Sequence, residues 1–144
     1  MKQEDYQCSF TAAIGPEEAI EHISDVSAWW AKKLEGCTRL LHDVFTVHFG
    51  DTFVSFEITG LVPGRKLEWL VTDCYLHWIN DKQEWTGTRI VWEVEAAGDQ
   101  TRIHMRHEGL VPSAECFADC RQGWDHHIKD SLLKYMEEEV GIPE

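Results

Sequence analysis

Positive charge is scarce in this sequence. Lysine and arginine together number 13, against 26 aspartates and glutamates, so the formal net charge is -13. A surface of this sign repels phosphate backbones and anionic headgroups, and we expect no nucleic-acid partner. No apolar run approaches the ~18 residues that a membrane span requires, and the N-terminus lacks the charged-then-apolar order of a signal peptide. We therefore expect a cytoplasmic protein without membrane insertion.

Regular cysteine spacing and the short motifs of common enzymes are also missing. Five cysteines form no disulfide pattern, which favours reduced thiols. There is no glycine-rich phosphate loop and no G-x-S-x-G nucleophile elbow. Zinc would need four converging ligands, but His126 and His127 lie ~9 Å farther along a helix axis than Cys116 and Cys120. We expect no metal, no cofactor and no dedicated catalytic residue.

Tryptophan, by contrast, is abundant, with seven residues in a chain of 144. This length is sufficient for one domain with its own core, and we expect a single domain over residues 1–144. So many large rings are seldom needed to fill a core of this size, and an aromatic surplus is one way to line a pocket. The alternative, that each ring only fills the core, stays open.

A long helix is predicted from Pro112 to about Glu139. Its apolar stripe recurs at steps of three or four, is wider than a coiled-coil seam, and comprises Cys116, Cys120, Trp124, His127, Ser131 and Tyr135. A helix of ~26 residues at ~1.5 Å per residue spans on the order of 40 Å, enough to cross a sheet. Gly123 interrupts it at a cost of about 1 kcal/mol relative to alanine, which suggests that another backbone approaches closely there.

The preceding residues predict a sheet for this helix to cover. A first strand at 5–13 is followed by helices at 16–23 and 24–33. Strands of alternating hydrophobicity then follow at 43–49, 52–62, 66–73, 86–97 and 101–108. Residues 75–84 fit either an edge strand or a hairpin arm. The short turns favour an antiparallel sheet. The fold class is therefore α+β, a helix-grip fold: a curved antiparallel β-sheet wraps around a long C-terminal α-helix, with two short helices after the first strand.

Several short motifs, in this order, carry a resemblance to a known superfamily. They are Pro16-Glu17-Glu18-Ala19, Trp29-Trp30, Val62-Pro63-Gly64-Arg65, Trp85-Thr86-Gly87-Thr88, His107-Glu108-Gly109-Leu110 and Gly123-Trp124. The chain resembles the START and birch-pollen-allergen superfamily, called SRPBCC, and within it the branch named for the activator of the heat-shock-protein-90 ATPase. The resemblance implies a hydrophobic cavity between the sheet and the long helix, used in the superfamily for lipids and other apolar ligands.

Eight residues are candidates for lining that cavity: Trp30, Phe45, Phe56, Trp69, Trp92, His107, Trp124 and His127. Aromatic rings with a few polar groups are typical of sites for apolar molecules, so we expect binding of a small hydrophobic ligand. One rival is an enzyme of hydrolase, cyclase or isomerase type that uses His107 in the same cavity. Another is a protein-interaction module such as a chaperone regulator. An edge strand could also pair two copies into a homodimer.

Overall fold

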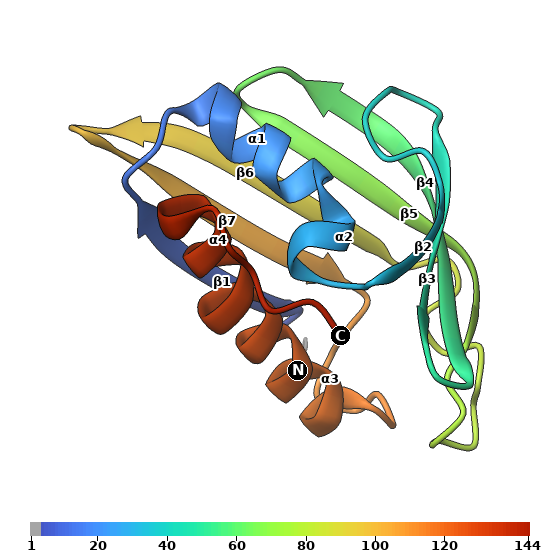
Figure 1. Ribbon diagram of the computed structural model, residues 1–144. Helices are drawn as coiled ribbons and strands as arrows, with labels where there is room; N and C mark the ends of the chain where they lie inside the picture. The colour runs from blue at the N-terminus through green and yellow to red at the C-terminus, as the bar shows by residue number, and fades with distance from the viewer. Residues whose placement is uncertain (1–3) are drawn as a thin grey trace.

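The computed structural model describes residues 4–144 and consists of an antiparallel sheet with all helices on one side (Figure 1). The seven strands lie in the order β1-β7-β6-β5-β4-β3-β2. They are β1 (Tyr6–Ala12), β2 (Lys33–Gly36), β3 (Val44–Phe49), β4 (Thr52–Val62), β5 (Lys66–Tyr75), β6 (Arg89–Ala97) and β7 (Gln100–Glu108). The predicted helix-grip fold is confirmed.

The helices come from two parts of the chain, one after the first strand and one near the C-terminus. After β1 come α1 (Pro16–Ser24) and α2 (Val26–Trp29). The C-terminal helix is continuous over three segments, α3 (Phe117–Asp125), the π-helical η1 (His126–Leu132) and α4 (Leu133–Glu138). Helix α1 begins with proline, which costs no hydrogen bond there because the first N–H groups of a helix have no partner within it. Glu17 and Glu18 follow in the first turn, where negative charge interacts favourably with the helix dipole.

The strands bury the faces that their alternation predicts. In β4, Val54, Phe56 and Ile58 are buried, and in β5 the same holds for Leu67 and Trp69. The register continues this layer, because Leu67 lies opposite Trp92 of β6, which in turn lies opposite Met105 of β7. The large rings of the core therefore come from neighbouring strands and meet under the helices.

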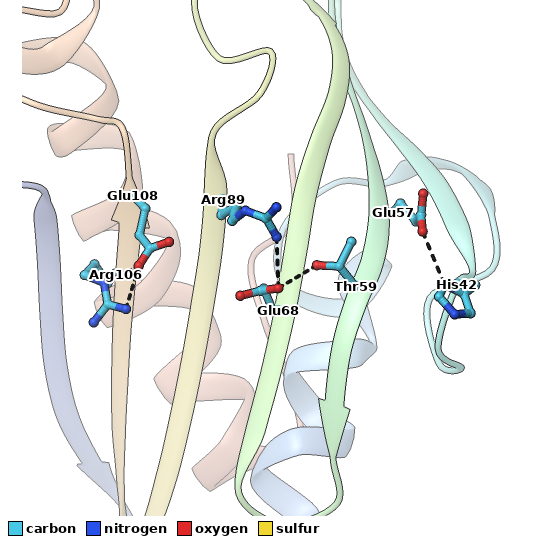
Figure 2. A network of polar contacts seen from close by, with 7 residues as sticks. All are labelled: His42, Glu57, Thr59, Glu68, Arg89, Arg106 and Glu108. Atoms are coloured by element: carbon cyan, nitrogen blue, oxygen red, sulfur yellow. Dashed lines mark hydrogen bonds and ion pairs between the residues drawn. The ribbon is translucent and has the colours of Figure 1, made fainter.

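The opposite face of the sheet carries polar and charged side chains (Figure 2). The Glu68 carboxylate accepts a hydrogen bond from Thr59 Oγ1 at 2.8 Å and pairs with Arg89 at 3.1 Å. Arg106 and Glu108 pair on β7 at 2.7 Å. Because this face faces solvent, an apolar site has room only on the side of the sheet that the helices cover.

The C-terminal helix begins five residues later than the predicted Pro112. Residues 112–116 form turns, and α3 starts at Phe117. The free backbone N–H groups of Glu115 and Cys116 donate to the Glu84 carboxylate at 2.8 and 3.0 Å. Since a carboxylate from outside the helix caps these donors, the chain needs no further helical turn to satisfy them.

Two other segments differ from the sequence-based expectation. The second predicted helix, 24–33, is only the four-residue α2, because the chain turns at Trp30 and residues 33–36 pair with β3 as the short edge strand β2. The ambiguous stretch 75–84 is neither an edge strand nor a hairpin arm. Residues 76–88 form an irregular loop of turns between β5 and β6.

Cys116 and Cys120 are paired as a disulfide across one helical turn, with their Cα atoms 5.6 Å apart. The expectation of reduced thiols is therefore wrong for this pair, because residues four apart face the same side of a helix and come within bonding reach. Cys8, Cys37 and Cys74 are free. The disulfide lies at the start of α3, beside loop 76–88.

The C-terminal segment after α4 returns along the helix and joins it to α2. Ser131 Oγ donates to Trp29 O at 2.5 Å and accepts from the backbone N–H of Ile142 at 2.7 Å. The backbone N–H of Glu144 donates to Trp30 O at 3.0 Å. These bonds bring Glu144 next to Trp30. Within residues 4–144, no helix is both long and apolar enough to cross a membrane.

Candidate functional site

A cleft of about 230 Å³ opens between the sheet and the start of the C-terminal helix. One wall comes from the ends of β3 and β4, the second from loop 76–88, and the third from α3 and η1. Its lining consists of Trp30, Phe49, Thr52, Val54, Leu76, His77, Trp78, Trp85, Asp119, Cys120, Gly123, Trp124, His127 and Glu144. The lining is mainly aromatic, with polar groups at a few points.

Tryptophan rings form the deep part of this cleft. Trp30 and Trp124 lie with their ring centroids 5.0 Å apart, and Trp85 stacks on Trp124 at 5.8 Å with an interplanar angle of 9°. All three are buried, whereas Trp78 at the rim is 43% exposed. Rings packed this closely have little freedom to turn, so the atoms that they present to the cleft form a preformed apolar surface.

Of the eight predicted residues, three line the cleft: Trp30, Trp124 and His127. Phe45, Phe56, Trp69 and Trp92 lie beneath it in the core, each at most 1% exposed. The two groups are in contact, since the ring of Trp30 stacks on that of Trp69 at 6.3 Å. The structure thus brings these seven residues into one aromatic cluster, and side chains fill the space beneath the cleft.

His107, the eighth predicted residue, lies behind Trp124 and is fully buried. Its Nδ1 accepts a hydrogen bond from Trp124 Nε1 at 3.1 Å, so the ring proton is on Nε2, which faces Thr88 Oγ1 at 2.9 Å. The Thr88 hydroxyl donates in turn to Trp85 O at 2.6 Å. Burial lowers the pKa of His107 to about 3. A neutral imidazole with both nitrogens occupied and no access to the cleft holds Trp124 in place and has no free position for proton transfer.

His127 is the polar side chain that η1 contributes to the lining. Its ring lies 5.9 Å from Phe49 and 6.4 Å from Trp30, and burial lowers its pKa to about 4. Among residues 4–144, its Nδ1 finds no hydrogen-bond partner although it is buried. A neutral ring with an unused nitrogen can donate or accept one hydrogen bond from a ligand.

The π-helical segment η1 places His127 at this point. The wider π turn replaces the regular helical repeat just after α3, where the helix passes over the cleft. Such segments occur frequently at functional sites, because they shift side chains out of the positions that an α-helix would give them. No residue in the sequence signals the π turn in advance.

Loop 76–88 is tied to the start of α3 by two carboxylates acting in opposite directions. Glu84 accepts the N–H groups of Glu115 and Cys116, and Glu115 accepts those of Asn80 and Asp81 at 2.7 and 3.1 Å. These last bonds lower the pKa of Glu115. The loop therefore keeps a fixed position over the cleft despite its lack of regular structure.

Four of the lining residues that sequence patterns did not predict come from this loop. Leu76, His77, Trp78 and Trp85 lie in or beside the stretch that periodicity could not assign. His77 Nδ1 is 2.6 Å from Thr52 Oγ1, which joins the loop to β4. The surplus of tryptophan was the available signal for Trp78 and Trp85, because it indicated a pocket without showing which rings line it.

Gly123 has a different role from the expected close backbone contact. No described atom lies within 4 Å of the position that a Cβ would take, and the residue lines the cleft. The glycine leaves open space at the helix surface. A larger side chain at this position would enter the cleft.

A second hollow, of about 770 Å³, lies at the far end of the sheet. Its lining includes the outward-facing charged residues Arg65, Glu93, Glu95 and Arg102. None of the eight predicted residues lies there. Among residues 4–144, no three His, Cys, Asp or Glu side chains are grouped so that they could hold a metal ion.

The fold has close counterparts among solved structures. The solution structure of the Aha1 dimer from Colwellia psychrerythraea matches with a TM-score of 0.78 at 18% identity, over 95% of this chain and 98% of that chain. DynU16, from the dynemicin biosynthetic locus, matches with a TM-score of 0.70 at 16% identity, over 97% of this chain and 49% of that one. CalU16 from Micromonospora echinospora gives 0.66 at 15% identity, over 92% and 76%. No protein-family model and no curated protein matches the sequence.

These likenesses define the class of protein by its fold. The chain has the helix-grip fold of SRPBCC proteins. The Colwellia psychrerythraea structure shares this fold over nearly the whole chain, as the sequence resemblance predicts. At identities of 15% to 18%, the comparison carries the fold alone.

Proposed function

We propose that this protein binds a small hydrophobic ligand in the cleft between the sheet and the C-terminal helix. The observation that carries the proposal is the lining, in which four of the seven tryptophans converge on a space of about 230 Å³. Apolar sites with a few directed polar groups are the usual form of small-molecule pockets. Superfamily members with this fold have ligand-binding cavities at the corresponding layer.

The proposed ligand-binding residues are those that reach the cleft. Trp30 and Trp124 supply apolar surface, and His127 supplies the hydrogen bond. Phe45, Phe56, Trp69 and Trp92 support the rings from below. The volume suits a ligand of one or two rings, since the core under the cleft is filled.

An enzymatic role in the same cleft is less well supported. The predicted polar actor, His107, is separated from the cleft by Trp124 and has both ring nitrogens bonded. General acid–base catalysis needs a group within hydrogen-bond reach of the substrate. His127 is one of two imidazole rings in the lining, with His77, and its lowered pKa keeps it neutral near pH 7.

The experiment that tests the proposal is native mass spectrometry of freshly purified protein, with extraction and identification of any bound compound. We expect a discrete additional mass that is removed by organic solvent. The Gly123→Leu variant should lose it while remaining folded, because leucine favours a helix and its side chain enters the cleft. Ala118→Leu, at an exposed position of the same helix, is the matched control and should retain the mass.

Two outcomes would count against the proposal. If Gly123→Leu retains the bound compound as fully as the native protein, the compound lies elsewhere. If the native protein carries nothing and also fails to take up aromatic probes from solution, the cleft is not a ligand site. A protein partner would then become the leading explanation of the aromatic cleft.

We further propose the setting in which the protein works: one domain over residues 1–144, in the cytoplasm, able to form a homodimer. The Aha1 dimer of the same fold supports the homodimer, and three unpaired cysteines support a reducing compartment. The Cys116–Cys120 disulfide argues the other way. Light scattering during size-exclusion chromatography tests the dimer, and alkylation of thiols in intact cells tests the compartment.

A further inference from the structure

We infer that the cleft selects an organic cation, such as a substituted ammonium group attached to an apolar body, over neutral and anionic molecules of the same shape. This inference rests on the proposed function and gives the ligand a chemical class. Three features of the cleft support it: the sign of the charged residues around the cleft, the aromatic rings of its lining, and the charge state of its histidines.

The charged side chains of the lining are all acidic. Asp119 from the first turn of α3 and Glu144 from the C-terminal segment stand at the rim, and no lysine or arginine belongs to the described lining. The nearest loop cation, Lys82, is held elsewhere, because its Nζ donates to the carbonyl oxygens of His77 and Ile79 at 3.2 and 2.7 Å. A ligand carboxylate would therefore meet two like charges and no counter-charge, whereas a cation would meet two opposite ones.

The aromatic rings of the lining also attract cations. Four indoles border the space, and indole is the side chain whose ring face attracts cations most strongly. Trp78 is 43% exposed and makes a T-shaped contact with His77 at 5.7 Å, so it is the lining indole with the most surface open to a ligand. It stands at the rim with the carboxylates, where a cationic head would sit.

The remaining polar groups are compatible with a cation. His127 stays neutral near pH 7, since burial holds its pKa at about 4, and it adds no positive charge to the cleft. His126 lies outside the lining, and its ring contacts Asp130 and the rim carboxylate of Glu144 at 3.0 and 3.4 Å. The whole chain carries a formal charge of -13, which favours the approach of cations over a distance of about one Debye length.

A set of three probes that share a benzyl group tests the inference, and the first two have nearly identical shapes. Benzyltrimethylammonium carries the positive charge, neopentylbenzene replaces its nitrogen by carbon, and phenylacetate carries a negative charge. Binding is followed by quenching of tryptophan fluorescence at low ionic strength and again at high salt. We expect the Kd of the cation to be at least tenfold lower than that of neopentylbenzene, and phenylacetate to bind more weakly than either.

Charge-neutralising variants locate the source of the preference. In Asp119→Asn/Glu144→Gln, we expect the cation's Kd to rise three- to tenfold while that of neopentylbenzene changes less than twofold. Glu95→Gln/Asp99→Asn makes the same change of charge at the β6–β7 end of the sheet and should leave all three constants unchanged. Both double variants alter exposed side chains, so neither is expected to affect folding.

The outcomes separate this inference from the proposed function. Equal binding of cation and neutral probe, or tightest binding of phenylacetate, overturns the charge preference while the cleft remains a hydrophobic site. Binding of the cation that Gly123→Leu does not weaken means that the charge, and not the cleft, attracts the probe, which also overturns the inference. If none of the three probes binds, the proposed function fails together with it.

Discussion

Replacing His107 by alanine is the most direct test of the buried hydrogen-bonded chain under the cleft. The chain runs from Trp124 Nε1 to His107 and on to Thr88, with distances of 3.1 and 2.9 Å. Thr88 keeps its bond to Trp85 O at 2.6 Å after the substitution. The indole N–H of Trp124, by contrast, loses its acceptor in a site that water does not reach.

The expected loss of stability has two parts. An orphaned buried donor costs about 1–3 kcal/mol. The missing imidazole leaves a cavity on the order of 60 Å³, which at ~24 cal/mol per Å³ adds about 1.5 kcal/mol. The sum, about 3–4 kcal/mol, is a large part of the ~5–15 kcal/mol that stabilises a typical domain, and it corresponds to a fall in Tm of roughly 10 °C.

Urea unfolding followed by circular dichroism measures this quantity. His107→Gln restores an acceptor of similar reach, so we expect it to recover about half of the loss. Arg102→Ala is the control on the same strand, because Arg102 is exposed on the outer face, and we expect it to change stability by less than ~0.5 kcal/mol. If His107→Ala costs under ~1 kcal/mol, or no more than the control, the buried chain does not hold Trp124 and the argument is wrong.

Three further predictions concern pH, the helix start and the glycine of the cleft. Burial lowers the pKa of His107 to about 3 and that of His127 to about 4, so below the unfolded value of ~6.5 the unfolded chain binds protons that the folded one does not. The free energy of unfolding should thus fall as pH falls from 6.5 towards 4, by up to ~1.4 kcal/mol per pH unit for each histidine. Denaturant titrations between pH 7 and pH 5 measure this change, and a stability that does not vary with pH would contradict the prediction. Glu84→Ala removes the carboxylate that accepts two N–H groups at the start of α3. It should lower the free energy of unfolding, measured with a chemical denaturant, by about 1–2 kcal/mol. An unchanged unfolding midpoint would show that water replaces the carboxylate. Gly123→Ala should raise stability by up to ~1 kcal/mol, because the added methyl group meets no described atom within 4 Å, and a lower Tm would mean that the space is not open.

The sheet was largely predictable because its information is local. Alternating side chains show which face of a strand is buried, as in β4 and β6. The edge strand β2 has no such pattern in its sequence Lys-Leu-Glu-Gly, and it exists because β3 offers unpaired backbone groups. Propensity cannot reveal a strand whose stabilisation comes from its partner.

The candidate site was predictable only in part, for a related reason. Alternation places Trp69 and Trp92 on the inner face, but it does not say how deep they lie, and the structure covers both with other rings. Trp85 reaches the cleft from an irregular loop whose position depends on bonds to residues about thirty positions away. No local pattern contains those bonds.

The exchange of carboxylates between Glu84 and Glu115 has a consequence for motion. Four backbone amides, those of Asn80, Asp81, Glu115 and Cys116, depend on these two side chains. Breaking one set exposes the segment that carries the other, so the loop and the helix start should open as one cooperative unit with a common rate of hydrogen exchange. Since the loop also forms one wall of the cleft, a bound ligand should slow the exchange of all four amides together.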